Sequence, residues 1–232
     1  MPTDNVVEFV SKAEQSHMLF AMVILPLARM IHSGRIDPET VTREKFFDAL
    51  IGLGKSHDDA FEILVTRVEE EMRLIEHCLN EGEAKSGVVL LFTLIEGEVN
   101  ALIRILLRIR GFSAGTITDA LRGSDFDTKI DVLLPLLGVS VAARLRNAAL
   151  QCKAVRNLVV HNKASPALMS AAGNRPSDSE AAQDRAEQFF AENPVARLAV
   201  DLAKFLDAGV AEDPSFQWGQ QLFDRFYERG ET

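Results

Sequence analysis

The chain has few of the residues from which disulfide-rich or metal-stabilised proteins are built. Its 232 residues include 2 cysteines, 1 tryptophan and 1 tyrosine. Cys78 and Cys152 lie far apart within apolar helical patterns, so they form neither a disulfide framework nor a zinc knuckle, and free thiols suit a reducing cytoplasm. A glycine-rich phosphate loop and a Gly-x-Ser-x-Gly turn are also absent from the sequence. We therefore expect a cytoplasmic protein without a metal ion or a cofactor.

Long hydrophobic runs are missing as well. The longest run, residues 18–31, is interrupted by Pro26 and Arg29 and is shorter than the roughly 20 apolar residues that a membrane-spanning helix needs. The residues before it carry more acidic than basic side chains, which is not the pattern of a signal peptide. The run is therefore expected to form a buried helix, and no membrane association is predicted.

Positive charge is scarce overall, with 25 Lys and Arg against 34 Asp and Glu and a formal net charge of −9. A generic DNA-coating protein is normally basic, so this balance argues against that class. The charge is uneven, however: residues 1–80 sum to −6 (8 basic, 14 acidic), residues 81–165 to +3 (11 and 8) and residues 166–232 to −6 (6 and 12). The mildly basic middle third is either a chance feature or a surface for an anionic ligand.

The remaining pattern is helical almost throughout, because apolar residues recur at three- and four-residue spacing and no useful strand alternation occurs. The breakers then predict helices near residues 4–33 (kinked or split at Pro26), 41–52, 56–80, 83–110, 127–137, 140–162, 178–191, 194–208 and 214–228. Asp127 and Ser140 are the expected N-caps of two of them. The predicted fold is an all-α helical bundle. Its expected parts are an N-terminal helical extension (1–80), a helical domain (81–210) and a C-terminal docking helix (211–232).

The helix expected over residues 140–162 has a charged residue within its apolar stripe. At 100° per residue, one face collects Leu145, Ala148, Ala149, Cys152, Val155, Val159 and Val160. Arg156 falls on this face, between Cys152 and Val159. A guanidinium cannot lose its charge, so burying it unpaired costs several kcal/mol. Either the stripe is open at this point or a carboxylate meets Arg156.

Three acidic residues are candidates for that carboxylate. Glu96 and Glu98 lie in the apolar helix expected over residues 83–110, and Asp131 lies in the helix that follows. Glu96 comes after a mostly apolar stretch, which makes it a candidate buried charge. The alternative for each acid is a solvated position at the edge of its helix.

Two further polar residues lie near Arg156. Asn157 and His161 are four residues apart, so they share a face at the end of the same helix. This end carries the negative pole of the helix dipole, which favours a protonated histidine. A lone histidine at a helix end is usually structural or solvated. Its combination with a misplaced arginine indicates a functional site.

The segment Arg156-Asn157-Leu158-Val159-Val160-His161 resembles the signature of HEPN domains, in which an arginine and a polar residue precede a histidine by a few positions. The surrounding order is also similar to that family: an apolar helix with an embedded acid, then Lys129 to Leu137, then the motif helix. The resemblance covers roughly residues 83–208. It implies a helical bundle of HEPN type that forms a homodimer, here through the motif helix.

The resemblance also implies chemistry on RNA. Many HEPN proteins are metal-independent endoribonucleases of toxin–antitoxin, phage-defence and RNA-processing systems, in which a ribose 2′-OH attacks the adjacent phosphate. In such a site His161 would transfer a proton, Arg156 would stabilise the phosphorane, and Asn157 would orient His161 or a phosphate oxygen. One of the three acids named above would hold Arg156. The expected partners are RNA, a second copy of the chain, and an antitoxin or a nucleotidyltransferase.

Other HEPN proteins are inactive, which leaves two alternatives to catalysis. In the first, the chain is a non-catalytic module that uses the same surface for dimerisation or for binding nucleotides or RNA. In the second, it is an all-α protein in which the motif is accidental.

Overall fold

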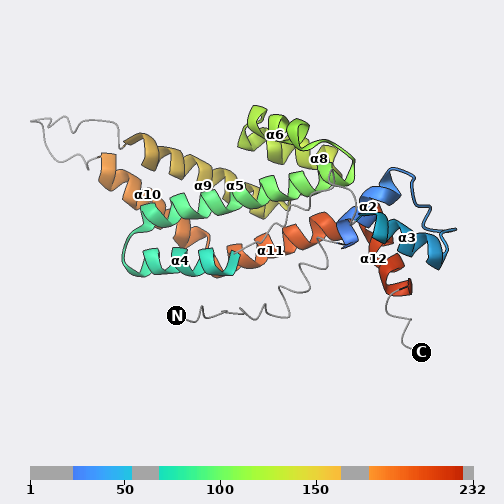
Figure 1. Ribbon diagram of the computed structural model, residues 1–232. Helices are drawn as coiled ribbons and strands as arrows, with labels where there is room; N and C mark the ends of the chain where they lie inside the picture. Colours follow the sequence, from blue (N-terminus) through green and yellow to red (C-terminus); the bar gives the residue numbers. More distant parts are fainter. Residues whose placement is uncertain (1–22, 54–67, 163–177, 227–232) are drawn as a thin grey trace, which may run out of the picture. The chain divides into compact units, whose positions relative to one another are not determined.

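The computed structural model describes residues 23–53, 68–162 and 178–226. Every regular element in these ranges is helical (Figure 1), so the all-α class predicted from the sequence is confirmed. The first part of the helix expected over residues 4–33 and the first part of that expected over 56–80 lie outside the described residues.

The described helices follow the order of the predicted ones with one addition. They are α2 (Leu25–His32), α3 (Arg43–Leu53), α4 (Val68–Asn80), α5 (Ala84–Ile109), α6 (Ala114–Gly123), α7 (Phe126–Thr128), the π-helical segment η3 (Lys129–Leu133), α8 (Leu134–Leu136), α9 (Ala143–Asn162), α10 (Asp178–Glu192), α11 (Val195–Ala211) and α12 (Pro214–Phe226). The segments α7, η3 and α8 follow one another directly and correspond to the helix expected over residues 127–137. The addition is α6, whose sequence has too few apolar residues to stand out.

The chain divides into two compact units. Of the described residues, unit 1 comprises 23–53, 107–113 and 211–226, and unit 2 comprises 68–106, 114–162 and 178–210. This division differs from the domain ranges expected from the sequence, because α4 falls in unit 2 and α12 falls in the same unit as α2 and α3. Unit 1 therefore combines segments from both ends of the chain.

The core of unit 1 forms where α12 packs against α2. Its buried residues are Leu27, Ile36, Val41, Phe46 and Leu222. The two helices approach closely at Gly219, where an added Cβ atom would lie 3.3 Å from the backbone oxygen of Ile24. The C-terminal helix therefore docks through a glycine and through aromatic contacts, such as that between Phe46 and Phe226 with ring centroids 5.1 Å apart.

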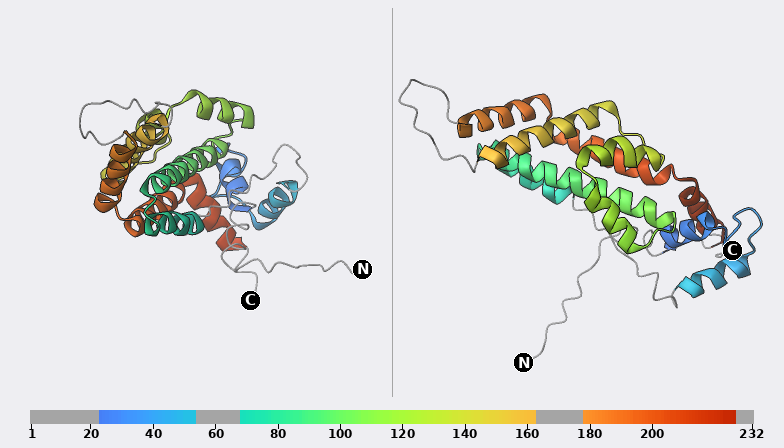
Figure 2. Two further views of the ribbon diagram at one scale, coloured as in Figure 1. Left: turned by 90° about the vertical axis from the view of Figure 1, so that its left-hand side faces the viewer. Right: turned by 90° about the horizontal axis from the view of Figure 1, so that it is seen from above.

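The core of unit 2 forms around α5. Helices α4, α9, α10 and α11 lie beside it (Figures 1 and 2). Close contacts document this packing: an added Cβ atom at Gly87 of α5 would lie 3.3 Å from the Phe190 ring of α10, and one at Gly209 of α11 would lie 2.7 Å from Leu102 of α5. The candidate site lies on α9, within this unit.

Candidate functional site

The buried face of α9 is close to the stripe predicted from the sequence. Its buried members are Leu145, Ala148, Ala149, Cys152 and Val159. Val155 is half-buried, whereas Val160 is 37% exposed and lies outside the buried face. The thiol of Cys152 lies 3.7 Å from the Val88 carbonyl oxygen of α5, and burial raises the pKa of this thiol. Cys152 is therefore a packing residue and not a reactive one.

Arg156 lies at the edge of this face and is half-buried. Its guanidinium carbon is 5.6 Å from the centroid of the Phe92 ring of α5, which is a cation–π distance. Its Nη1 donates a hydrogen bond of 3.1 Å to Oδ1 of Asn157. Phe92 in turn packs edge-on against Phe126 of α7, with ring centroids 5.0 Å apart. An aromatic ring and a neutral amide thus hold the guanidinium.

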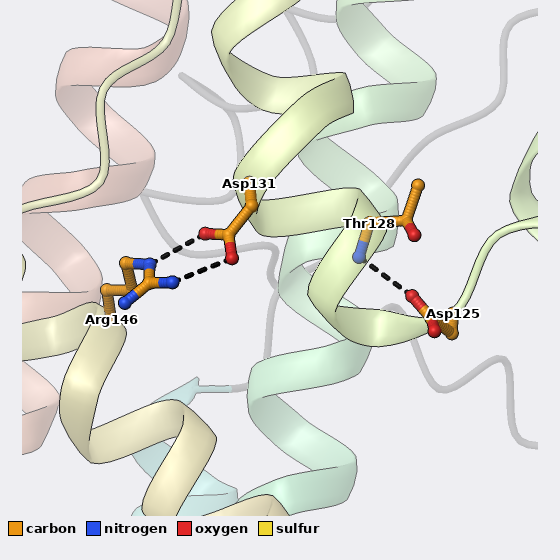
Figure 3. A network of polar contacts seen from close by, with 4 residues as sticks. All are labelled: Asp125, Thr128, Asp131 and Arg146. Atoms are coloured by element: carbon orange, nitrogen blue, oxygen red, sulfur yellow. Dashed lines mark hydrogen bonds and ion pairs between the residues drawn. The ribbon is translucent and has the colours of Figure 1, made fainter.

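The acid expected to pair with Arg156 is not found among the described residues, which corrects that expectation. Asp131 accepts two hydrogen bonds from Arg146, of 2.6 and 2.7 Å, in a bidentate pair (Figure 3). This pair holds the pKa of Asp131 below its usual range. Glu96 lies 3.6 Å from the Nζ atom of the buried Lys129. Of the two possibilities drawn from the sequence, an open stripe at Arg156 is the one observed.

Glu98, the third candidate, lies on α5, where the negative charge of Glu71 on α4 acts on it. Its residue is 7% exposed, and its Oε2 atom is buried without a hydrogen-bond partner in the described part of the chain. Burial, reinforced by the charge of Glu71 on α4, raises the pKa of Glu98 from 4.5 to about 7. Glu98 is therefore a buried carboxyl group of unit 2, and no ion pair joins it to Arg156 among the described residues.

The basic residues of α9 differ in whether an acid neutralises them. Three form ion pairs with acids of other helical segments: Arg144 with Asp201, Arg146 with Asp131, and Lys153 with Asp127. Arg156 has no carboxylate partner among the residues that the structure describes. Among the described Lys and Arg residues of α9, it is thus the one whose contacts are with uncharged groups alone, an amide and an aromatic ring.

His161 lies in the last turn of α9 and is exposed. Within the described ranges, no residue forms a hydrogen bond or an ion pair with it. Asn157 precedes it by one turn on the same face, whereas Arg156 lies about 140° around the helix and about 7.5 Å along its axis from His161. The hydrogen bond from Arg156 to Asn157 links the guanidinium to the face that carries His161.

Two residues beside this cluster, Phe92 and Lys153, are not among those predicted from the sequence. Phe92 is readable in the sequence only as one apolar residue of a long apolar helix, so nothing marks it as the ring beneath Arg156. Lys153 had a usable signal, because it precedes Asn157 by four residues and His161 by eight. It therefore shares the polar face of the helix with them.

Two kinds of feature are absent from the described part of the chain: a cluster of metal ligands and a membrane-spanning helix. No three His, Cys, Asp or Glu side chains there are grouped so that they could hold a metal ion. No described helix combines the length and the apolar character that crossing a membrane requires. The arrangement around Arg156 instead suits the binding of an anion.

The chain matches no protein-family model, no curated protein and no solved structure. The resemblance to HEPN domains therefore stays a prediction that rests on the six-residue motif and its surroundings.

Proposed function

We propose that the chain is a metal-independent endoribonuclease of HEPN type, with Arg156, Asn157 and His161 as its catalytic residues. The observation that carries this proposal is the unbalanced charge of Arg156, which contrasts with the ion pairs of the other described cations on α9. A half-buried guanidinium held by a ring and an amide retains donors for an anion. A phosphate can accept two parallel hydrogen bonds from it and supply the missing negative charge.

The reaction would be an internal transfer at phosphorus. The ribose 2′-oxygen attacks the adjacent phosphorus atom and loses its proton, while the 5′-oxygen of the next nucleotide leaves and gains one. The products are a 2′,3′-cyclic phosphate and a 5′-hydroxyl end, so no metal ion and no external nucleophile are required. Arg156 would stabilise the charge on the pentacoordinate phosphate, and His161 would transfer one of the two protons.

A second copy of the chain would supply the other proton-transfer group. Two apolar residues of α9 flank His161 in an exposed position: Leu158 is 38% exposed and Val160 is 37% exposed. Exposed apolar side chains around a polar site favour contact with a partner. Pairing of two α9 helices would bring two sets of Arg156 and His161 to one RNA strand.

The test is cleavage of an unstructured RNA oligonucleotide in the presence of EDTA. We expect Arg156→Ala and His161→Ala each to reduce the cleavage rate by about 10² to 10⁴-fold. Arg146→Ala is the matched control, because it removes the same charge from the same helix but its guanidinium is committed to Asp131. The products should carry 2′,3′-cyclic phosphate ends. RNA that stays intact with the purified wild-type protein, or normal cleavage by both site variants, would refute the proposal.

A non-catalytic dimerisation or RNA-binding module is the second candidate, and one observation favours it. The contacts of Arg156 with Phe92 and Asn157 already give this arginine a structural role. For such a module, Arg156→Ala would lower the melting temperature or dissociate the dimer in sedimentation, and the wild type would bind RNA without cleaving it.

Phe92→Leu separates the two candidates further, because leucine keeps the position apolar but removes the ring beneath the guanidinium. A cation–π contact is worth about 0.5–1 kcal/mol at an exposed site. In the catalytic case we expect a several-fold lower cleavage rate in a variant that still forms the dimer. A loss of the dimer without any change in the rate per dimer would favour the structural role.

A further inference from the structure

We infer that Lys153 binds a second phosphate of the RNA, next to the phosphate at Arg156, and that its ion-pair partner Asp127 weakens this binding. The inference rests on the proposed function and deepens it. It names a two-phosphate segment of a single RNA strand as the minimal ligand of the site.

Lys153 lies on α9 about one turn before Arg156 and Asn157. It precedes Arg156 by three residues and Asn157 by four, so its direction from the helix axis falls between theirs, about 60° from the first and about 40° from the second. Along the axis it lies about one turn, or roughly 5 Å, before them. Two long cationic side chains one turn apart can each meet one of two successive phosphates on a strand that runs along the helix.

Lys153 has more hydrogen-bond donors than its ion pair with Asp127 uses. Its ammonium group carries three N–H donors. Its Nζ atom lies 2.8 Å from Oδ2 of Asp127, which uses one donor, and its side chain is 25% exposed. In Arg146, by contrast, Nε and Nη2 are both engaged by Asp131. Lys153 can therefore donate to a phosphate while it keeps its ion pair.

Asp127 and a neighbouring aspartate bring negative charge close to Lys153. Its Oδ2 atom holds Lys153, whereas its Oδ1 atom is buried and has no hydrogen-bond partner in the described ranges. The Oδ1 atom of the neighbouring Asp125 accepts a hydrogen bond from the Thr128 amide (Figure 3). The hydrogen bonds with Thr128 lower the pKa of Asp125, and the positive charge of Lys153 lowers it further. The start of α7 thus places carboxylates beside Lys153. Their negative charge would oppose a phosphate at this point and limit the affinity.

The test measures how RNA binding depends on salt. Binding of a short fluorescent single-stranded RNA is followed by anisotropy from about 50 to 300 mM KCl, in the His161→Ala background so that the RNA stays intact. Each phosphate contact with a single strand contributes about 0.7 to the slope of log K against log salt. We expect Lys153→Gln to weaken binding and to reduce this slope by about 0.7, and Lys153→Arg to restore it. Asp127→Asn should have the opposite effect and tighten binding.

The matched control is the other ion pair of the same helix. Arg146→Gln and Asp131→Asn remove equivalent charges, and we expect both to leave the salt slope unchanged because this pair lies about two turns before Lys153. A purely structural ion pair between Lys153 and Asp127 predicts that Lys153→Gln and Asp127→Asn weaken binding alike, without a change of slope. That outcome, or an unchanged slope in Lys153→Gln alone, overturns the inference.

Failure of the inference can be told apart from failure of the proposed function. If the chain cleaves RNA in a manner that requires Arg156, but Lys153→Gln binds RNA with the wild-type slope, only the second phosphate site is wrong. If the wild type binds no RNA under any of these salt conditions, the proposed function fails and the inference fails with it. With active protein, Lys153→Gln should raise the KM for RNA several-fold and change kcat less.

Discussion

Glu98 offers the sharpest test of how the core of unit 2 is built. It is 7% exposed on α5, its buried Oε2 atom has no hydrogen-bond partner in the part of the chain that the structure describes, and the charge of Glu71 on α4 acts on it. Burial first, and Glu71 second, disfavour the charged form and raise the pKa of Glu98 from 4.5 to about 7. We therefore expect Glu98→Gln, which keeps the shape and removes the ionisation, to stabilise the protein at alkaline pH.

The sign of the effect follows from proton binding in the two states. Between about pH 4.5 and pH 7 the folded state holds more protons at Glu98 than the unfolded state does. The free energy of unfolding therefore falls as the pH rises through this window, and it levels off above it. The difference between 4.5 and about 7, at about 1.36 kcal/mol per pH unit, corresponds to a loss of roughly 3 kcal/mol. A glutamine cannot ionise and should not incur this loss.

Urea unfolding of the wild type and of Glu98→Gln at pH 5 and pH 8.5 measures the effect. Far-UV circular dichroism is the suitable signal, since the sole tryptophan, Trp218, lies in unit 1 and not in the unit that holds Glu98. Between the two pH values, the wild type should lose up to roughly 3 kcal/mol more than the variant. Glu71→Gln should reduce the pH dependence in part. An equal pH dependence in the wild type and in Glu98→Gln would refute the reasoning.

Two further predictions concern packing in unit 2. An added Cβ at Gly209 would lie 2.7 Å from Leu102, which is 1% exposed, whereas one at Gly97 meets nothing within 4 Å. Gly209→Ala should therefore cost about 1–3 kcal/mol in thermal unfolding, while Gly97→Ala should stabilise by about 0.5–1 kcal/mol; effects of equal sign would contradict this. Cys152 is fully buried and burial raises the pKa of its thiol, whereas Cys78 is half-buried. A maleimide should therefore label Cys78 first in the native protein, as intact mass would show, and early labelling of Cys152 would contradict its burial.

Apolar periodicity was enough to predict the long helices of unit 2. The helix expected over residues 83–110 is observed as Ala84–Ile109, and that expected over 140–162 as Ala143–Asn162. Each buries a face along its whole length, so the three- and four-residue spacing is visible in the sequence. Helix α6, Ala114–Gly123, escaped prediction because only two of its residues are buried, Ile117 and Leu121. One apolar pair does not establish a period.

The helix cap near residue 127 shows a limit of reading single positions. The sequence predicts Asp127 as the N-cap, but Asp125 occupies that position and its Oδ1 atom accepts a hydrogen bond of 2.8 Å from the Thr128 amide (Figure 3). Two aspartates two residues apart are equally good caps by composition. Which of them serves depends on where the backbone turns into the helix. Asp127 does not cap the helix and forms an ion pair with Lys153 instead. The cap assignment from the sequence therefore did not predict this ion pair.

The partners of the site residues could not be read from the sequence for a similar reason. The segment from α7 to α8 runs antiparallel to α9, so Asp131 meets Arg146 and Asp127 meets Lys153. This segment begins its helix at Phe126. Its aspartates, Asp127 and Asp131, pair with residues of α9 that precede Arg156, and neither forms an ion pair with Arg156 in the described part of the chain. The aromatic pair of Phe126 and Phe92 lies there instead.

The surroundings of Arg156 show how a charged side chain can lie at the edge of an apolar stripe without an acidic partner among the described residues. A charge in an apolar stripe does need compensation. At the edge of the stripe a ring face and an amide oxygen can provide part of it, while the rest of the guanidinium stays accessible. Such partners carry no net charge, so they hold Arg156 in place without neutralising it. A carboxylate at this position would block the arginine as an anion site. In the proposed function, the absence of such a carboxylate among the described residues leaves the guanidinium available to a phosphate.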